Sequence, residues 1–205
     1  MMIRRKTSKS GRNLQSERKL RAAPPLALLL ALFLTTAAAP ATTLLRMSLE
    51  QMTQAAAVIV RAQCLENSTG WDAGEIWTFT SFDVQEIWSG SAPNEITVRL
   101  LGGRVAGVTS TVSGVPRFRP GEEVVLFLEP TPRGDFSIVS WQQGTFRIRR
   151  DAPSGAENVT QDTAAFATFD PAARQFHAAG IRNLPLGAFR AQVAAALRAR
   201  PPRKP

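Results

Sequence analysis

The sequence is poor in the side chains that most often carry catalysis near neutral pH. Its 205 residues include one cysteine, one histidine and no tyrosine. Proton transfer and nucleophilic attack near neutral pH usually depend on such groups. The chain also lacks the HExxH, G-x-S-x-G and P-loop patterns and any cluster of cysteines and histidines. We therefore predict a non-enzymatic protein with no catalytic residue, no metal site and no cofactor.

The two scarce residues, Cys64 and His177, have no neighbours with catalytic or metal-ligating spacing. A lone cysteine cannot form a disulfide within its own chain. Cys64 lies in the strand-like run VIVRAQCLE, so we expect its side chain to be buried and to behave as an apolar group. His177 lies in a weakly patterned segment. A reactive thiol, an intermolecular disulfide and a Cys64–His177 dyad are the alternatives.

The positive charge of the chain lies at its two ends. The formal net charge is +9; residues 1–41 contribute +7 and residues 171–205 another +7, whereas residues 42–170 carry −5. The central body is therefore mildly acidic, and an acidic body repels polyanions. Nucleic acid is accordingly disfavoured as a partner.

Residues 1–41 have the three regions of a secretory signal peptide. Eight lysines and arginines precede the apolar run LALLLALFL at residues 26–34, and the small residues TTAAAPATT follow it. Ala39-Pro40-Ala41 fits an A-x-A cleavage site, which predicts a mature chain beginning at Thr42; residues 36–38 form a weaker alternative site. The protein is therefore expected to be secreted or periplasmic. The alternative is an uncleaved leader, which is the only attachment to a membrane that we expect.

Strand-type patterns dominate residues 42–150, and helical patterns flank them. The capping box Ser48-Leu49-Glu50-Gln51 predicts a short helix over residues 49–56. Apolar runs predict strands at residues 57–66, 75–88, 95–101, 122–129, 135–141 and 145–149, the fourth of them buried on both faces. A break in the alternation at Phe82, Val84 and Ile87 predicts a bulge in the second strand. This spacing indicates an all-β meander or Greek key.

Turn and loop signals divide these strands. NSTGWDAG at residues 67–74 predicts a hairpin loop, and residues 102–118 predict a long connection that contains several glycines. The polar residues 151–184 are expected to form a loosely ordered connection after the β-barrel domain at 42–150. Residues 185–205 are expected to form an amphipathic helix and a basic, proline-rich tail. The apolar residues that recur there at helical spacing are Leu186, Phe189, Val193 and Leu197.

The order of these elements resembles a family of uncharacterised secreted bacterial proteins. They share an SLEQM-type helix, an SGxPRFxxGEEVxLFL core and a GxFRI closing strand, and the resemblance covers residues 42–150 and, more weakly, the LPLGAFR helix. The family carries no assigned activity, so the resemblance implies no function.

More distantly, the strand order is similar to netrin-like domains, which include the inhibitory domain of the tissue inhibitors of metalloproteinases. This likeness implies a small OB-type barrel of about five to six strands, with a short N-terminal helix and a C-terminal amphipathic helix. Those inhibitors place an N-terminal cysteine on the metal and contain several disulfides. Here the expected mature start is Thr42 or Ala39 and Cys64 is alone, so their mechanism does not carry over.

The stretch SGVPRFRPG places Arg117, Phe118 and Arg119 before the fourth strand and is open to two interpretations. In the first, the following Pro-Gly is turn chemistry, Phe118 lies beneath the barrel, and both arginines face the other way. The arginines would then pair with acidic residues of the body. The partners expected for them are Glu122 and Glu95.

In the second interpretation, this stretch and the connection at residues 102–118 form a binding site, because OB-type barrels bind oligomers across their loops. Trp71, Trp77 and Trp88 are candidates, by residue type, for exposed aromatic contacts. The predicted function is a secreted, non-enzymatic binding or protein-interaction module for an unknown protein or polysaccharide partner. The alternatives are an enzyme of unrecognised type, and a polyanion or envelope-surface binder acting through the basic C-terminal tail.

Overall fold

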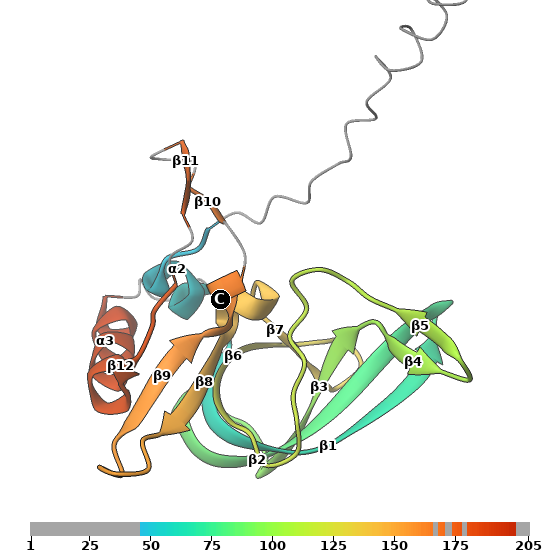
Figure 1. Ribbon diagram of the computed structural model, residues 1–205, viewed down its shortest axis with the longest axis horizontal. Helices are drawn as coiled ribbons and strands as arrows, with labels where there is room; N and C mark the ends of the chain where they lie inside the picture. Colours follow the sequence, from blue (N-terminus) through green and yellow to red (C-terminus); the bar gives the residue numbers. More distant parts are fainter. Residues whose placement is uncertain (1–45, 166–167, 171–173, 178–179, 200–205) are drawn as a thin grey trace, which may run out of the picture. The chain divides into compact units, whose positions relative to one another are not determined.

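The computed structural model describes residues 46–165, 168–170, 174–177 and 180–199 (Figure 1). The expected signal peptide, its cleavage site and residues 200–205 of the basic tail lie outside the described residues. Among the helices that are described, none is long and apolar enough to cross a membrane.

The described chain consists mainly of β-strands, which confirms the all-β prediction. The helices are α2 (Leu49–Ala55) and α3 (Leu186–Arg198), and short 3₁₀ helices span Trp141–Gly144 and Asp162–Ala165. The strands are β1 (Val58–Asp72), β2 (Glu75–Ser89), β3 (Glu95–Leu101), β4 (Gly103–Val105), β5 (Val108–Ser110), β6 (Glu123–Pro130), β7 (Phe136–Ile138), β8 (Thr145–Arg150), β9 (Glu157–Gln161), β10 (Thr168–Asp170), β11 (Gln175–His177) and β12 (Leu184–Pro185).

Strands β1, β2, β3, β7 and β6 follow one another around a barrel-like ring. β1 pairs with β2 on one side and with β6 on the other, β2 pairs with β3, and β7 joins β6 to β3. The pairing of β3 with β7 is parallel and consists of one residue pair, Val98 with Phe136. From β6 the sheet continues outside the ring through β8, β9 and β12 (Figure 1). The sheet therefore has eight strands, of which five form the ring.

Strand β6 belongs to both hydrophobic cores, as the prediction of a strand buried on both faces required. Val124, Leu126 and Leu128 face the interior of the ring, where they pack with residues of β1, β2 and β3. Val125 and Phe127 face the opposite way, into a second core beneath α2 and α3. Alternating side chains of one strand can serve two cores because the β period is two residues.

The two helices cover the outer face of the sheet where β6, β8 and β9 lie. The capping box of α2 is present: Ser48 Oγ accepts from the Gln51 N–H at 3.2 Å, and Gln51 Oε1 accepts from the Ser48 N–H at 2.8 Å. In α3, Phe189 is fully buried and its ring lies 4.5 Å from that of Phe146. The predicted apolar stripe of the C-terminal helix therefore faces this outer core.

The hairpin loop predicted at residues 67–74 is wrong. β1 continues to Asp72, and the turn consists of Ala73 and Gly74, whose φ angles are 51° and 83°. Each residue from Asn67 to Asp72 pairs with one of β2, and Thr80 Oγ1 donates to Asn67 Oδ1 at 2.7 Å. Pairing with a long partner strand outweighs the weak strand preference of Asn, Ser and Gly.

The bulge predicted in the second strand is present, beside Val84 and Ile87. Phe82 faces the same side of β2 as Ile76, and both are buried. Thr78 and Thr80 between them also face inward, and their hydroxyls are hydrogen-bonded. The register with β1 shifts later, skipping Gln85 and Trp88 in β2, and it also skips Leu65 in β1. Such bulges bend the hairpin, and Figure 1 shows its strong curvature.

The loosely ordered connection predicted at residues 151–184 is also partly wrong, because β9 forms within it and pairs with β8. Gln161 anchors the region: its Nε2 donates to the Gln143 carbonyl at 2.6 Å, and its Oε1 accepts from the Ile181 N–H at 3.2 Å. The strand predicted at residues 135–141 shortens to β7, followed by the 3₁₀ helix that presents Gln143.

Candidate binding site

Arg117 ends the long connection between β3 and β6, and its guanidinium reaches back to the end of β3. Nη1 donates to Thr78 Oγ1 at 3.2 Å and to the Gly102 carbonyl at 3.4 Å, and Nη2 donates to the Leu101 carbonyl at 3.2 Å. All three acceptors are neutral, and no ion pair of Arg117 occurs in the described part of the chain. Partial burial therefore lowers the pKa of Arg117 without a compensating carboxylate.

Two glycines make room for this guanidinium. Gly102 has a φ of 87°, and a Cβ there would lie 2.8 Å from Arg117 Nη2 and 2.6 Å from the Ser110 carbonyl oxygen. Gly103 has a φ of 150°, and a Cβ there would lie 2.7 Å from Thr78 Oγ1. Both positions require glycine, because any side chain would collide with the groups that hold Arg117.

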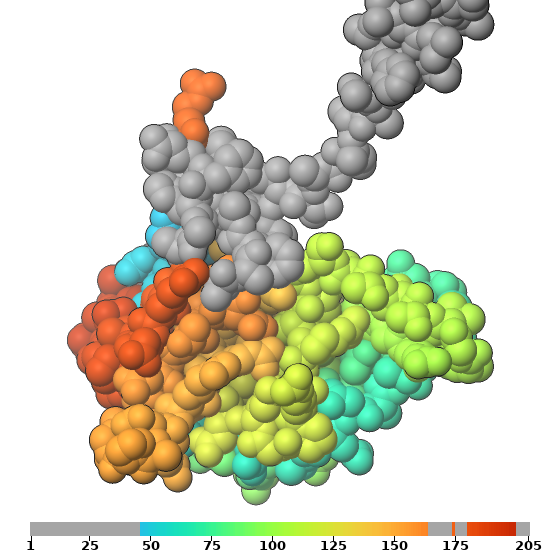
Figure 2. Space-filling view, viewed as in Figure 1, coloured from blue at the N-terminus to red at the C-terminus, as the bar shows by residue number. Residues whose placement is uncertain are grey.

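Beside Arg117 lies a cavity of about 330 Å³, which we call the arginine cavity. The connection that covers it contains the β4–β5 hairpin, seen in yellow-green beside β1 and β2 in the space-filling view (Figure 2). Its lining combines two guanidinium groups with hydroxyls and one amide, and it includes no carboxylate. The lining residues are Asn67, Thr78, Leu100, Gly103, Arg104, Thr109, Ser110, Thr111, Arg117 and Phe118.

A second cavity, of about 230 Å³, adjoins the first at Ser110, and we call it the tryptophan cavity. Its lining side chains are mainly apolar. Two of them are exposed to solvent to an unusual degree for large apolar residues: Trp71 is 57% exposed and Val108 is 50% exposed. The lining residues are Trp71, Gly74, Glu75, Ile76, Leu101, Val108, Ser110 and Val112. The turn end of the β1–β2 hairpin and the β4–β5 hairpin thus enclose a polar cavity and an apolar one side by side.

Phe118, the third predicted site residue here, belongs to the interior of the ring. It is 6% exposed, and its ring meets that of Phe82 edge-on at 5.0 Å between centroids. Arg147 lies over its other side at 5.4 Å from the centroid. The first interpretation of the stretch is therefore correct for Phe118, whereas Arg117 lines a cavity.

The ion pairs predicted between the arginines of this stretch and Glu122 or Glu95 do not occur in the described chain. Glu122 binds Arg147 instead, at 2.6 Å. From Arg119 it accepts a hydrogen bond of the backbone N–H, at 3.0 Å, and none from the side chain. Arg147 comes from β8, which the sheet places beside β6. Long-range pairing thus brings a nearer cation to Glu122, and the Arg119 side chain stays exposed.

Trp77 does not join the two cavities, because it lies on the opposite face of β2 from Ile76 and Thr78. The Arg99 guanidinium stacks on the Trp77 ring at 4.2 Å from its centroid. Arg99 also binds Asp72 at 2.5 Å, and Asp72 in turn binds Arg133 of the β6–β7 turn at 2.6 Å. Trp77 is therefore half-buried under Arg99, which the acidic residues beside it hold in place.

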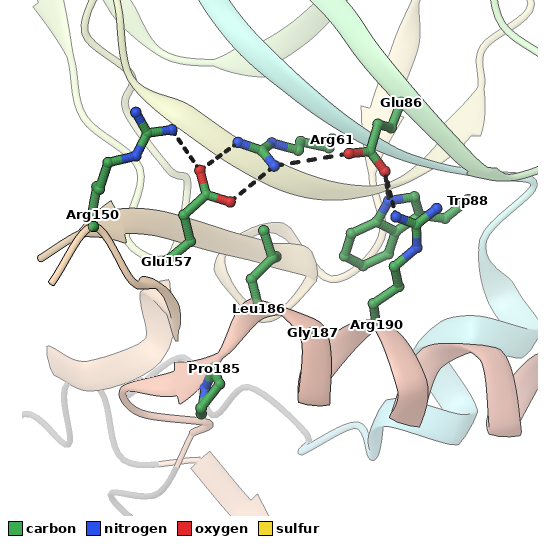
Figure 3. Close-up of a pocket in the computed structure, with 10 residues that line it drawn as sticks. Arg61, Glu86, Trp88, Arg150, Glu157, Pro185, Leu186, Gly187 and Arg190 are labelled. Carbon is green, nitrogen blue, oxygen red and sulfur yellow. Dashed lines mark hydrogen bonds and ion pairs between the residues drawn. The ribbon is translucent and has the colours of Figure 1, made fainter.

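Sequence reasoning missed a third cavity, of about 660 Å³, between the sheet and the first turn of α3 (Figure 3). Arg61 is its central charge: it binds Glu157 through two hydrogen bonds of 2.8 and 3.1 Å and lies 3.8 Å from Glu86. Arg150 binds Glu157 at 2.7 Å, and Arg190 binds Glu86 at 2.8 Å. We call it the ion-pair cavity; its lining holds three arginines and two glutamates in alternation, and Arg61 also binds Glu123, which lies outside the lining, at 2.5 Å.

Trp88 belongs to this ion-pair cavity. Its indole N–H donates to Glu86 at 3.2 Å, and its ring packs on Phe189 with Arg190 on the other side at 5.6 Å. Arg61 and Glu86 lie opposite each other in the pairing of β1 with β2. A correct prediction of that strand register was the one signal in the sequence that could have shown that these two charges meet. The other members come from β8, β9 and α3, and no local pattern connects them.

Cys64 is 1% exposed in the interior of the ring, which confirms the prediction of a buried apolar side chain. Burial raises the pKa of its thiol. The backbone of His177 lies in β11, but its side chain is outside the described residues. Across the residues that can be described, no three potential metal ligands of the His, Cys, Asp and Glu types cluster.

Function is therefore inferred from the arginine cavity and the tryptophan cavity, where two of the predicted residues, Arg117 and Trp71, line adjoining walls. Compared with known protein families and with curated proteins, the chain matches no family model and no protein.

Proposed function

We propose that the protein is a secreted, non-enzymatic binding module that holds a polysaccharide across the arginine and tryptophan cavities. The observation that carries this proposal is Arg117, a cation held by three neutral oxygens in a cavity whose lining includes no carboxylate. Partly buried cations in proteins are normally paired. A guanidinium that is positioned but not paired suits a ligand that supplies the missing acceptor.

The proposed barrel is of OB type. The ring runs β1-β2-β3-β7-β6, and its fifth strand in chain order lies parallel to the third. That order is the one expected of an OB barrel, whose ligands bind at the loops between strands. The two cavities lie at such a place, between the turn of the first hairpin and the connection that follows the third strand.

The walls of the two cavities favour a carbohydrate over a protein segment. Thr109, Ser110 and Thr111 offer hydroxyl groups within one small volume, and the Asn67 amide beside them is held by Phe118 and Thr80. Trp71 offers an exposed ring beside them, and aromatic rings pack against the apolar faces of sugars. The pattern of pockets with a few convergent polar groups and an aromatic wall is that of a ligand site. Protein partners are the alternative outcome.

The chemistry of the lining supports binding without catalysis. General acid–base catalysis requires a group that exchanges protons near neutral pH, often two. The residues that line these two cavities supply hydroxyls, an amide, two guanidinium groups and a single carboxylate, that of Glu75. The proposal of secretion is supported by the signal-peptide pattern of residues 1–41.

The test uses the protein expressed from its full sequence, an array of neutral and acidic polysaccharides, and two single variants. Trp71→Ala removes an exposed wall of the tryptophan cavity, whereas Ile87→Ala removes a comparably exposed apolar side chain, 45% exposed, that lines none of the three cavities. We expect Trp71→Ala to weaken capture by about tenfold or more and Ile87→Ala to leave it unchanged. Equal capture by both variants, or capture of proteins alone, contradicts the proposal.

A further inference from the structure

We propose that Arg117 binds the carboxylate of an acidic sugar residue, so that the ligand is a uronic-acid-containing polysaccharide. This inference rests on the proposed function and names the chemical group that the arginine cavity recognises. Three features carry it: the donors that Arg117 has left, the polar groups around them, and the charge of the body.

Arg117 keeps donors that no hydrogen bond in the described part of the chain uses. An arginine side chain has five N–H donors. Two of those on Nη1 and one on Nη2 are used by Thr78, Gly102 and Leu101. The Nε donor and the second Nη2 donor have no partner in the described part of the chain. Nε and Nη2 form the side edge of a guanidinium, the edge that pairs with the two oxygens of a carboxylate.

The groups that hold the guanidinium also fix its direction. The backbone carbonyls of Leu101 and Gly102 cannot rotate away, and the left-handed backbone at Gly102 keeps them close to Nη1 and Nη2. The remaining edge is therefore presented in one orientation. Fixed donors lose little conformational entropy on binding, which favours a specific acceptor over a diffuse ion atmosphere.

The rest of the arginine cavity suits the hydroxyls of a sugar. Thr109, Ser110 and Thr111 follow one another along and after β5 and contribute hydroxyl groups that both donate and accept. Arg104 adds a second cation without a carboxylate beside it in the lining. A sugar carboxylate on Arg117 would place its ring hydroxyls among these groups.

The charge of the whole body selects among anionic ligands. Residues 42–170 carry a net charge of −5, and the four arginines of residues 171–199 bring the whole fold to −1, so it has no strong positive field to attract a polymer with dense charge such as a polyphosphate or nucleic acid. A polymer with one carboxylate per sugar has a lower charge density, and part of its binding surface is neutral. The carboxylate of an acidic sugar can therefore bind Arg117, while the net charge of the protein repels the rest of the polymer only weakly.

The experiment compares a uronic acid oligomer with the same oligomer after its carboxylates have been reduced to alcohols. Affinities for the full chain are measured by calorimetry, with thermal melts as a control for folding. We expect the parent to prefer the acidic oligomer by about tenfold or more, and Arg117→Gln to lose that preference. Arg117→Lys keeps the charge but not the paired donors, so it should recover only part. Arg119→Gln, two residues away and exposed, is the matched control and should bind like the parent.

A measurement on the parent alone covers the case in which Arg117→Gln fails to fold. As the pH falls through the pKa of the sugar carboxylate, binding of the acidic oligomer should weaken to that of the reduced oligomer, which should not change. Equal affinity for both oligomers overturns the inference; if Trp71→Ala weakens both, the proposed function survives. Binding of neither oligomer overturns both, and equal binding of polyglutamate would replace the sugar by an acidic protein segment.

Discussion

At the scale of single residues, the stretch from Arg117 to Arg119 alternates between the surface and the core. Arg119 is exposed and Arg117 is buried in part where its guanidinium meets Thr78 and Gly102, whereas Phe118 between them is 6% exposed. Phe118 packs on Phe82, and this contact fixes the backbone from which Arg117 reaches the Leu101 carbonyl. The buried ring therefore positions the cavity residue next to it.

Phe118→Ala should lower the free energy of unfolding by about 3–5 kcal/mol, the usual loss when a buried phenylalanine is truncated. Arg119→Ala removes a side chain without an ion pair in the described chain and should change stability by about 0.5 kcal/mol or less. Urea denaturation of both variants measures the difference. A Phe118→Ala protein as stable as the parent would show that this ring is not part of the core.

Arg61 is the residue on which the ion-pair cavity depends. Its side chain is 14% exposed and binds Glu123 and Glu157, whereas Arg150, which also binds Glu157, is 63% exposed. Arg61→Ala leaves partly buried carboxylates facing one another and should cost about 3 kcal/mol. Arg150→Ala should change the stability much less, because its ion pair is exposed. Equal losses in denaturation would mean that burial of Arg61 has no effect.

The same cavity predicts a loss of stability in acid. Hydrogen bonds from Arg150 and Arg61 lower the pKa of Glu157 from its ordinary 4.5. A carboxyl whose pKa is depressed by folding stabilises the protein above the unfolded pKa, and this contribution disappears as the pH falls through the folded pKa. Glu157→Gln should therefore be less stable than the parent at about pH 7, and the difference should shrink as the pH falls below 4.5 and on through the lowered pKa. A difference that stays constant across that range would refute the assignment.

At the scale of elements, the β1–β2 hairpin shapes two of the three cavities at one end and the third at the other. Trp71 and Ile76 near its turn line the tryptophan cavity, while Arg61 and Glu86, beyond the bulges, line the ion-pair cavity. The register shifts bend the hairpin between these two ends. A hairpin of the same length without bulges would not bring Glu86 toward α3.

The turn of this hairpin is not optimal for its conformation. Ala73 has a φ of 51°, in the left-handed region that alanine disfavours and asparagine tolerates. Asn followed by Gly is the preferred pair for a two-residue hairpin turn with both φ angles positive. Ala73→Asn should therefore stabilise the protein by about 0.5–1 kcal/mol, measured as a rise in Tm. A lower Tm would indicate that the turn adopts another conformation in solution.

At the scale of the whole molecule, one strand ties two cores together. The ring encloses the first core, and α2 and α3 cover the second on the outer face of the same sheet. Both cavities of the proposed site lie at the ring, whereas the ion-pair cavity lies at the outer layer beside α3. Substitutions in the proposed site and in the ion-pair cavity should therefore affect ligand binding and stability independently of each other.

The exported protein should begin at Thr42. The reason is the Ala39-Pro40-Ala41 triplet that follows the apolar run at residues 26–34. N-terminal sequencing of protein recovered from the periplasm or the medium measures the start directly. Recovery of the intact chain in a membrane fraction would replace secretion by an uncleaved anchor.

The sequence by itself determined those features whose cause lies within one element. The alternation of Ile96, Val98 and Leu100 predicts their burial, and the box at Ser48 and Gln51 predicts the start of α2. Each depends on a local period or a hydrogen bond between near neighbours, which a single run of residues records.

Only the tertiary structure decided the partners of the charged and aromatic residues. The pairing of β8 with β6 brings Arg147 to Glu122 and so leaves Arg117 to the neutral carbonyls beyond β3. The pairing of β1 with β2 likewise turns an expected loop into strand and places Trp71 beside Ile76. These contacts join segments far apart in the chain, and their free energy exists only once the sheet has closed. No local pattern therefore records them, and the site could not be assembled from the sequence.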